Sequence, residues 1–318
     1  MADQTEQRTL PAFVVERVEE SYGGADAARI LDGLRAAADR PVTLRTNTLK
    51  TNAERIGQAL DDAGIAHTRV PWYPDAFVLE NACERDVWSL DIYRDGEVYL
   101  QSLSSMLPPL ALTPHTGADI LDMCAAPGGK TSQMAALADG AARITACELN
   151  GPRAEKLEYN LAKLGAKNIQ VMRCDARKLD TFFSFDQILL DAPCTGSGTV
   201  RGDDGKAARR ITPQLLDKVT RSQRALIDRA LTVLKPGGTL VYSTCSILPA
   251  ENEDIVAAAL KRHRDCVIEP IAIANGNTGE LAIPYLPNQL EGTLTVCPTR
   301  EFEGFYMARI KRRTRKQR

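Results

Sequence analysis

Two short segments that contain cysteine are the most chemically suggestive parts of this sequence. Cys194 lies in the run DAPCTGSG, which starts at Asp191, and Cys245 lies in the run STCS. A cysteine is usually a small buried apolar residue, but as a thiolate it is a strong nucleophile. Because both segments directly follow stretches that we expect to be buried strands, Cys194 and Cys245 are candidates for covalent catalysis. We expect five other cysteines to be small buried apolar residues without a catalytic role: Cys83, Cys147, Cys174, Cys266 and Cys297.

A glycine-rich turn is the first candidate for a ligand site. The run CAAPGGKT starts at Cys124, and its two glycines, Gly128 and Gly129, let the backbone approach a ligand closely. A P-loop needs glycine where Cys124 stands, and the dinucleotide pattern GxGxxG is absent. The remaining option is S-adenosylmethionine, whose carboxylate would face the free N–H groups of the helix that follows the turn.

Acidic residues follow the next three expected strands. Glu148 comes about 20 residues after the glycines, where a carboxylate can accept hydrogen bonds from ribose hydroxyls. Asp175 is suited to an adenine amino group, and Asp191 follows the fourth strand. A single acid at a strand end is commonly a helix N-cap, but a glycine turn and three acids in succession favour an adenosyl ligand.

A thiolate beside a methyl donor suits one reaction in particular, methylation of cytosine at C5. That carbon is a poor nucleophile until a thiolate adds at C6, and a group facing N3 assists the addition by taking up developing charge. Cys245, Asp191 and the predicted cofactor would provide this set. Lys130 is a candidate to support the thiolate or orient the base, the alternative being a solvated lysine at the start of a helix.

The elements that must position these residues alternate between strand and helix after residue 118. We predict strands over 118–123, 143–147, 169–174, 185–190 and 239–243, and helices from the glycine turn to 138 and over 153–164, 213–234 and 251–263. Short strands that are apolar on both faces are typical of a parallel sheet covered by helices on both sides. We therefore predict an α/β fold with a doubly wound, mostly parallel, Rossmann-like sheet, to which residues 304–310 add a last edge strand.

The first hundred residues have a different texture. Helical spacing over 11–20, 25–38 and 53–63, an alternating stretch over 42–49 and short apolar runs near 68–70 and 76–79 predict a small α+β domain. We place it at residues 1–97 and the catalytic domain at 98–318. Residues 101–112 are expected to form a helix that joins the two.

Composition and motif content indicate the cellular location, thiol state, metal content and oligomeric state that we expect. No apolar run is long enough to span a membrane, and the N-terminus lacks the apolar core of a signal peptide, so we expect a cytoplasmic protein with free thiols. No metal is expected, because no two cysteines form a CxxC and the three histidines lie far apart. Nothing in the sequence indicates oligomerisation, and a monomer is expected.

A nucleic-acid partner is indicated by local charge only, since the net charge is −1. Basic residues gather in the tail 309–318 and in the loop 199–210, which are either solvated or in contact with phosphates. We expect RNA binding to depend on these and on Arg45, Lys50, Arg201, Arg209 and Arg210. Trp72, Tyr73 and Trp88 are the aromatic residues that could stack on bases, although core packing is the commoner role.

Three motifs together resemble the Nop/Sun family of RNA (cytosine-5) methyltransferases. They are DMCAAPGGKT, DAPCTGSG and STCS, and the resemblance covers residues 100–309, with a weaker likeness of LRTNTLK at 44–50 to the family's N-terminal segment. The resemblance implies that Cys245 attacks C6 and that Cys194 assists breakdown of the adduct and product release. It also implies an RNA-recognition-like fold for the N-terminal domain and a substrate in tRNA or rRNA. The implied cofactor residues are Cys124, Ala125, Ala126, Pro127, Gly128, Gly129, Lys130, Glu148, Arg153, Asp175 and Asp191.

Two other functions stay open at this point. An amino-group methyltransferase would carry an aromatic residue in the loop where this chain has DAPC. A catalytically silent RNA-binding or assembly factor would keep the fold without needing both motif cysteines, yet both are present. The particular RNA and the particular cytosine are not visible in the sequence.

Overall fold

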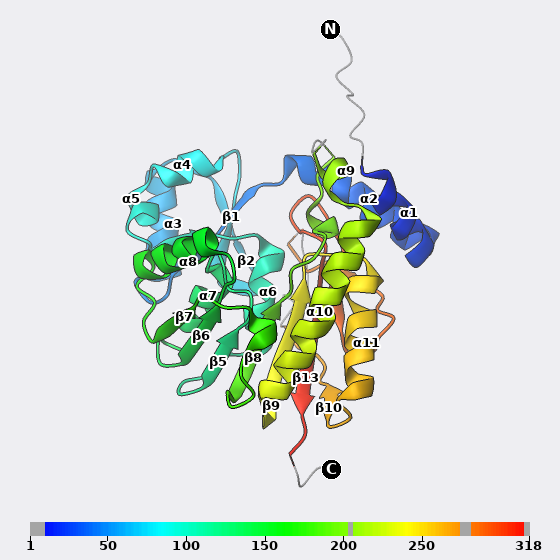
Figure 1. The fold of residues 1–318 in the computed structure, drawn as a ribbon. Helices are drawn as coiled ribbons and strands as arrows, with labels where there is room; N and C mark the ends of the chain where they lie inside the picture. Colours follow the sequence, from blue (N-terminus) through cyan, green and yellow to red (C-terminus); the bar gives the residue numbers. More distant parts are fainter. Residues whose placement is uncertain (1–9, 203–205, 274–280, 315–318) are drawn as a thin grey trace.

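The computed structural model describes residues 10–202, 206–273 and 281–314 (Figure 1). The helices are α1 (Ala12–Ser21), α2 (Gly24–Ala36), α3 (Ala53–Asp62), α4 (Glu84–Trp88), α5 (Asp91–Arg94), α6 (Leu103–Leu112), α7 (Gly129–Leu137), α8 (Gly151–Lys163), α9 (Ala207–Arg210), α10 (Pro213–Val233) and α11 (Glu253–Arg262). Short 3-10 turns are η1 (Ala37–Asp39), η2 (Ala176–Lys178), η3 (Ser197–Thr199) and η4 (Pro249–Glu251). The strands are β1 (Val42–Thr46), β2 (His67–Val70), β3 (Tyr73–Leu79), β4 (Val98–Leu100), β5 (Asp119–Asp122), β6 (Arg143–Cys147), β7 (Ile169–Met172), β8 (Phe185–Asp191), β9 (Leu234–Thr244), β10 (Cys266–Ile268), β11 (Tyr285–Leu286), β12 (Leu294–Val296) and β13 (Phe305–Arg312).

A nine-stranded sheet forms the centre of the molecule, with strand order β11-β12-β13-β9-β8-β5-β6-β7 and β10 paired to β13. The five strands from β7 to β9 are parallel, whereas β13 is antiparallel to β9. The predicted doubly wound, mostly parallel fold is confirmed. The prediction that residues 304–310 form an edge strand is wrong, because β13 lies between β9 and β12 and both of its sides are hydrogen-bonded.

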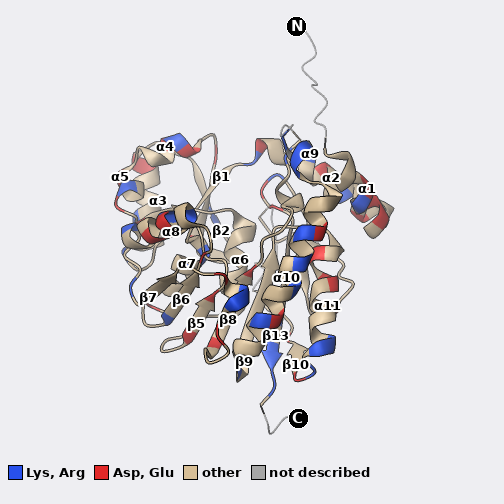
Figure 2. Ribbon diagram, viewed as in Figure 1, with Lys and Arg blue, Asp and Glu red and all other residues tan. Residues whose placement is uncertain are grey.

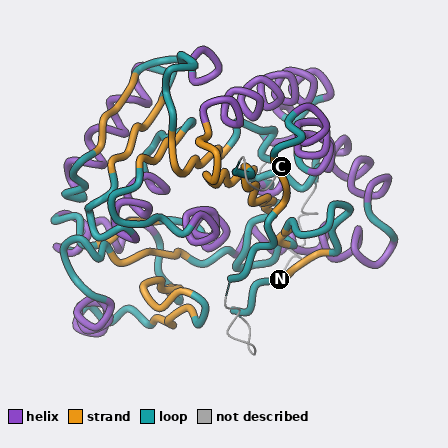
Figure 3. The backbone as a smooth tube through the Cα atoms, turned by 90° about the horizontal axis from the view of Figure 1, so that it is seen from below, coloured by secondary structure: helices purple, strands orange, loops and turns teal. Residues whose placement is uncertain are grey.

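Helices cover both faces of this sheet (Figures 1 and 3). Successive residues of a strand point to opposite faces, so neighbouring side chains join different cores. Ile120 and Leu189 pack under α6 and α7, whereas Leu121 and Leu190 pack under α10 and α11. Burial on both faces explains why these strands are continuously apolar in the sequence.

Residues near the N-terminus form a second, four-stranded antiparallel sheet with order β2-β3-β1-β4. One face, with Leu44 and Phe77, packs under α3, and the other face joins the core beneath α6 through Ala76 and Val78. Pairing with β1 assigns β4 to this sheet, so the sheet extends past the boundary expected at residue 97.

Helices α1 and α2 do not cover the small sheet. Val14, Val18 and Ile30 pack instead against Ile247 and Leu248, which follow β9. In Figure 1, α1 and α2 accordingly lie on the other side of the molecule from α3, α4 and α5. The N-terminal segment thus packs against the large sheet on two sides, through α1 and α2 next to the end of β9 and through the small sheet beneath α6. Within the described residues, none of the helices is both long and apolar enough to cross a membrane.

Candidate active site

The carboxyl ends of the parallel strands gather the predicted site residues at one edge of the sheet. β5 leads into the turn that starts at Cys124, β8 ends at Asp191, and β9 ends one residue before Cys245. Asp191 and Ser243 are register partners across β8 and β9, so the two motif cysteines enter neighbouring loops. This edge is where ligands bind in open α/β sheets.

The turn after β5 is shaped by its glycines. Gly128 has φ +108°, which favours glycine, and a Cβ on Gly129 would lie 2.7 Å from the ring of Tyr99. Beneath the turn, the buried Asp122 accepts hydrogen bonds from the Cys124 amide at 3.4 Å and the Thr131 hydroxyl at 2.7 Å. The turn therefore forms a backbone cradle that a larger residue at either glycine would fill.

Two cavities meet at this turn, and Cys124 lines both. The first, of about 300 Å³, contains Ala125, Ala126, Pro127, Gly129, Lys130, Asp191 and Cys245. The second, of about 360 Å³, contains Glu148, Arg153 and Asp175. In the second, Arg153 donates to the Ala126 carbonyl at 2.9 Å and lies 3.5 Å from Glu148, while Asp175 pairs with Arg177 at 2.8 Å. The carboxylates of Glu148 and Asp175 can accept hydrogen bonds from the hydroxyl and amino groups of a ligand, and the backbone of the turn can hold a ligand carboxylate. This combination fits S-adenosylmethionine.

The thiols of Cys194 and Cys245 are brought into contact, with their Sγ atoms 3.2 Å apart. Cys245 lines the first cavity, whereas Cys194 does not appear among the described residues of its wall. The hydrogen bond with Cys245, burial and the charges of Cys245 and Glu251 raise the pKa of the Cys194 thiol. The raised pKa favours the neutral thiol form of Cys194, beside the half-buried Cys245.

Lys130 and Asp191 form an ion pair at 2.8 Å on the wall of the same cavity. The ammonium group also donates to the Ser105 hydroxyl at 2.7 Å and lies 5.6 Å from the ring centre of Phe305, and Ser243 donates to Asp191 at 2.8 Å. Burial lowers the pKa of Lys130, but the negative charges of Asp191 and Cys245 outweigh it, and the net direction is upward. Lys130 is thus a fixed cation and not a solvated lysine.

Sequence reasoning missed Glu251, which we had included only as the start of a helix. Its side chain is fully buried and accepts hydrogen bonds from Thr195 and Ser246, one residue on from each motif cysteine. The sequence feature that could have indicated Glu251 is its position six residues after Cys245, in the acidic run AENE. That feature is not specific, because acidic residues are common at a helix start, where they stabilise the helix. Ser105 of α6 and Tyr99 of β4 were missed because neither follows a strand of the large sheet.

Several residues expected on an RNA-binding surface have other roles. Arg45 is completely buried and donates to Gln101, Ser132 and the Gly129 carbonyl, so it supports the cofactor turn from β1. Lys50 donates to the carbonyls of Asp95 and Lys163. Trp72 and Tyr73 are core residues, while Trp88 is 44% exposed. The prediction of an RNA contact at Arg45 is wrong because the side chain has no access to solvent.

The basic tail also begins differently from the expectation. Arg309 and Arg312 lie within β13, where they pair with Glu269 and Asp265. Because β13 runs antiparallel to β9, the chain leaves the sheet at the edge opposite the catalytic loops (Figure 1). Residues 315–318 and 203–205 lie outside the described residues. Of the loop's basic residues, Arg201, Arg209 and Arg210 are exposed, and Figure 2 shows further basic residues along α10, interspersed with acidic ones.

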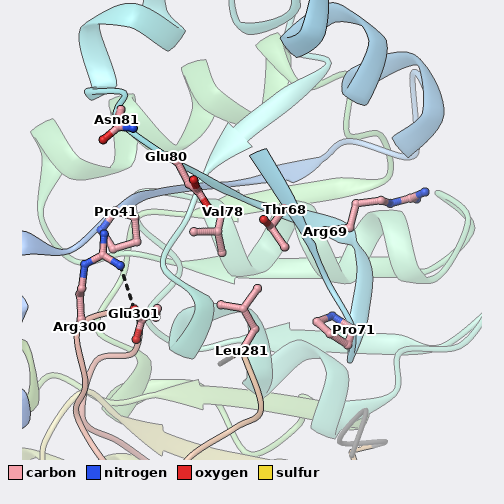
Figure 4. Close-up of a pocket in the computed structure, with 10 residues that line it drawn as sticks. All are labelled: Pro41, Thr68, Arg69, Pro71, Val78, Glu80, Asn81, Leu281, Arg300 and Glu301. Carbon is pink, nitrogen blue, oxygen red and sulfur yellow. Dashed lines mark hydrogen bonds and ion pairs between the residues drawn. The ribbon is translucent and has the colours of Figure 1, made fainter. Parts of the chain in front are cut away.

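Another cavity, of about 470 Å³, lies away from these loops (Figure 4). Its wall joins Thr68 and Val78 of the small sheet to Leu281 and Arg300, and the Arg300 guanidinium is paired with Glu301 at 3.2 Å. It contains none of the motif cysteines or acids. Within the described ranges, no group of three or more His, Cys, Asp or Glu side chains is arranged to hold a metal ion.

Comparison with known proteins identifies the family of this chain. The profile of the family described as 16S rRNA methyltransferase RsmB/F matches residues 109–311, and that of the ferredoxin-like domain of RsmF/B-like methyltransferases matches residues 10–86. The ribosomal RNA small subunit methyltransferase F of Cronobacter sakazakii is 37% identical over 95% of this chain and 63% of its own length. That of Serratia proteamaculans is 37% identical over 89% of this chain and 59% of its own length.

A solved structure gives the same result for the fold. A methyltransferase homologue from Pyrococcus horikoshii is 31% identical, with a TM-score of 0.76, over 95% of this chain and all of its own. The fold is therefore that of the Rossmann-like methyltransferases, and the two cavities at the turn fit S-adenosylmethionine. The chain belongs to the RsmB/F family of 16S rRNA methyltransferases, within the Nop/Sun group that its motifs resemble. It spans about three fifths of the length of these curated relatives.

Proposed function

We propose that this chain transfers a methyl group from S-adenosylmethionine to C5 of a cytosine in RNA, through a covalent bond between Cys245 and C6. The observation that carries the proposal is the contact of the Cys194 and Cys245 thiols, 3.2 Å apart, at the cavity that also holds the Lys130–Asp191 pair. A single thiol would be expected in an inert core position. Two thiols in contact beside a buried cation and a cofactor cradle support covalent catalysis.

Cys245 is the nucleophile in this proposal because it is the thiol that lines the cavity. Its thiolate adds to C6, and the electron pair of the C5–C6 bond makes C5 nucleophilic. C5 then takes the methyl group from the sulfonium of the bound cofactor, whose S–CH₃ bond breaks. Loss of the C5 proton to solvent re-forms the C5–C6 double bond and expels the Cys245 thiolate, so atoms and charge balance over the cycle.

Lys130 and Asp191 both assist the addition step in this proposal. Lys130 supplies a positive charge beside the cavity that Cys245 lines, and the charge of Cys245 is among the causes that raise the pKa of Lys130. Asp191 is oriented by Lys130 and Ser243 at the cavity wall, where it would face N3 of a bound cytosine. There it would accept a hydrogen bond from a cytosine that has taken a proton from solvent at N3. That proton neutralises the negative charge that develops as the thiolate adds, and it returns to solvent when the thiolate leaves.

Cys194 acts in the last step. The two sulfurs are 3.2 Å apart and either could donate, but the raised pKa of Cys194 favours Cys194 as the thiol that keeps its proton and donates. That bond stabilises the Cys245 sulfur as it regains its negative charge when the C6–S bond breaks. This arrangement supports attack by Cys245 and release assisted by Cys194, rather than the reverse.

The names of the relatives favour ribosomal RNA over tRNA as the substrate. We propose the RNA of the small ribosomal subunit, which would place the reaction in the cytoplasm. The test is incubation of the purified protein with methyl-labelled S-adenosylmethionine and, separately, small subunits, free small-subunit RNA and tRNA, followed by mass spectrometry of nucleosides. We expect labelled 5-methylcytidine from ribosomal RNA with the parent and with Cys83→Ser, which alters a remote thiol.

Other outcomes would redirect the proposal in defined ways. A labelled nucleoside methylated elsewhere than C5 would contradict the thiol mechanism while leaving the cofactor in place. Label in tRNA alone would contradict the choice of ribosomal RNA. No label in any fraction, with cofactor binding shown by calorimetry, would contradict the enzymatic function and favour a silent RNA-binding factor.

A further inference from the structure

The contact between the two thiols depends on a buried network that centres on Glu251. This residue, in η4, has no exposed surface, and both of its carboxylate oxygens are occupied. One oxygen accepts from the Thr195 amide at 2.8 Å and from Gln223 of α10 at 3.2 Å. The other accepts from the hydroxyls of Thr195 and Ser246, each at 2.6 Å.

These four bonds connect the two catalytic loops. Thr195 directly follows Cys194, and Ser246 directly follows Cys245, so Glu251 is bonded to the neighbour of each thiol. Further bonds run in parallel: Ser197 and Ser246 share a hydroxyl contact at 2.8 Å, and the Gly198 amide donates to the Cys245 carbonyl at 3.0 Å. Bonds to a carboxylate are about twice as strong as neutral ones, so Glu251 is the strongest member of this set.

The charge of Glu251 also distinguishes the two thiols. It is one of the causes that raise the pKa of Cys194, after the hydrogen bond with Cys245 and burial. Tyr242 also interacts with Cys194, and its hydroxyl donates to the Glu251 carbonyl at 2.6 Å. On the opposite side, Lys130 and Asp191 line the cavity with Cys245. The buried carboxylate of Glu251 thus favours the protonated form of Cys194.

We propose that Glu251 is a positioning residue for the methylation reaction: it ties the loop of Cys194 to the loop of Cys245 and keeps Cys194 as the hydrogen-bond donor of the pair. The inference rests on the proposed function, in which Cys194 assists release of Cys245. The proposal therefore predicts that loss of Glu251 affects mainly one step, the breakdown of the adduct. Attack by Cys245 needs Lys130 and the cavity, whereas breakdown of the adduct needs the donor thiol that Glu251 holds.

The test uses Glu251→Gln in the full chain, with Glu253→Gln as the matched control. Glutamine keeps the shape and accepts the Thr195 amide, but it removes the charge. Glu253 is also buried and lies two residues further on, at the start of α11, where its Oε2 atom has no hydrogen-bond partner among the described residues. Single-turnover reactions with substrate RNA follow adduct formation and decay on denaturing gels, across pH 6 to 9.

We expect Glu251→Gln to form the adduct at near the parental rate and to break it down about tenfold more slowly, so that adduct accumulates. The alkaline limit of the decay profile should also move to lower pH, because Cys194 loses a charge that raises its pKa. Glu253→Gln should behave as the parent does. A purely structural role would slow both steps together and leave the pH limit unchanged, and that result would overturn the proposal.

A second variant keeps the proposal testable if Glu251→Gln does not fold. Thr195→Val removes only the 2.6 Å hydroxyl bond and leaves the carboxylate in place. We expect slower decay of the adduct, by about threefold, without a shift of the pH limit. Unchanged decay in Thr195→Val would contradict the tether. Failure of the parent to methylate cytosine, or of Cys194→Ala to trap an adduct, would instead contradict the proposed function.

Discussion

The large sheet carries two pairs of neighbouring thiols, and they differ in what surrounds them. The Sγ atoms of Cys194 and Cys245 are 3.2 Å apart, and those of Cys147 and Cys174 are 3.7 Å apart. The first pair adjoins the buried ammonium of Lys130. The second lines the cavity of Glu148 and Asp175, where burial, Cys174 and the charge of Asp122 raise the pKa of Cys147.

This difference teaches that contact between thiols is not sufficient for catalysis. Both cavities hold cations, but the cations are engaged differently. Arg153 and Arg177 pair with Glu148 and Asp175 in the second cavity, whereas in the first the pKa of Lys130 is raised by Asp191 and also by Cys245. The second pair instead provides a polarizable wall for the ligand cavity. The predictions below change one pair at a time.

The largest effect is expected at the nucleophile. Cys245→Ser should reduce methylation at least about 10³-fold, because a hydroxyl at this position remains protonated and does not add to C6. Cys174→Ala, in the other pair, should retain turnover within about threefold and weaken cofactor binding only slightly. Both are measured by steady-state methyl transfer to RNA. Equal losses in the two variants would remove the distinction between the pairs.

Replacing the second thiol of the catalytic pair should separate the steps. Cys194→Ala should lower turnover by about 100-fold while the covalent adduct still forms and persists, since Cys245 loses the donor that assists its release. A protein–RNA band that resists denaturation should therefore increase. Loss of turnover without any such band would reverse our assignment of the two cysteines.

The cation is expected to act through the charge of the nucleophile. Lys130→Gln should lower the rate about 10- to 100-fold at neutral pH, because the Cys245 thiolate loses its counter-charge. Single-turnover methyl transfer to RNA measures the loss, and a rate within about twofold of the parental rate would contradict this role.

The smallest effect on activity, but a clear one on stability, is expected at Asp122 beneath the cofactor turn. Burial and the nearby charge of Asp191, opposed by the hydrogen bond from Thr131, raise its pKa from 3.8 to about 6. A raised carboxyl pKa favours folding below about pH 4, and this contribution is lost as the pH rises to 6. Relative to Asp122→Asn, the parent should lose roughly 3 kcal/mol of unfolding free energy across that range. Urea unfolding at several pH values measures the difference, and parallel curves would contradict it.

Much of the catalytic edge could be predicted because strands that are apolar on both faces indicate a parallel sheet, whose carboxyl ends lie together. The glycine turn, Glu148, Asp175, Asp191 and Cys245 all follow such strands. The contact of the two thiols could not be derived in this way. It depends on β8 and β9 being neighbours and on hydrogen bonds between their loops, which no local pattern specifies.

The residues that were misjudged share one cause, which is long-range burial. Arg45 follows the pattern of a solvent-facing arginine, but β1 packs against the start of α7 and covers it. Residues 304–310 come last in the strand pattern and so were expected at an edge, whereas β12 and β10 pair with β13 on the side away from β9. Glu251 fits the local pattern of a helix start. Its role is not visible in that pattern, because its hydrogen-bond partners lie 5 to 56 residues away in the chain.

The central claim is that Cys245, and not Cys194, attacks the base. RNA in which 5-fluorocytidine replaces cytidine cannot lose a proton from C5 after methyl transfer, so the adduct of the unaltered protein should persist. Digestion and mass spectrometry of that adduct would identify the modified peptide. We predict a methylated 5-fluorocytidine attached to Cys245, and its attachment to Cys194, or the absence of any adduct in an active preparation, would contradict the mechanism.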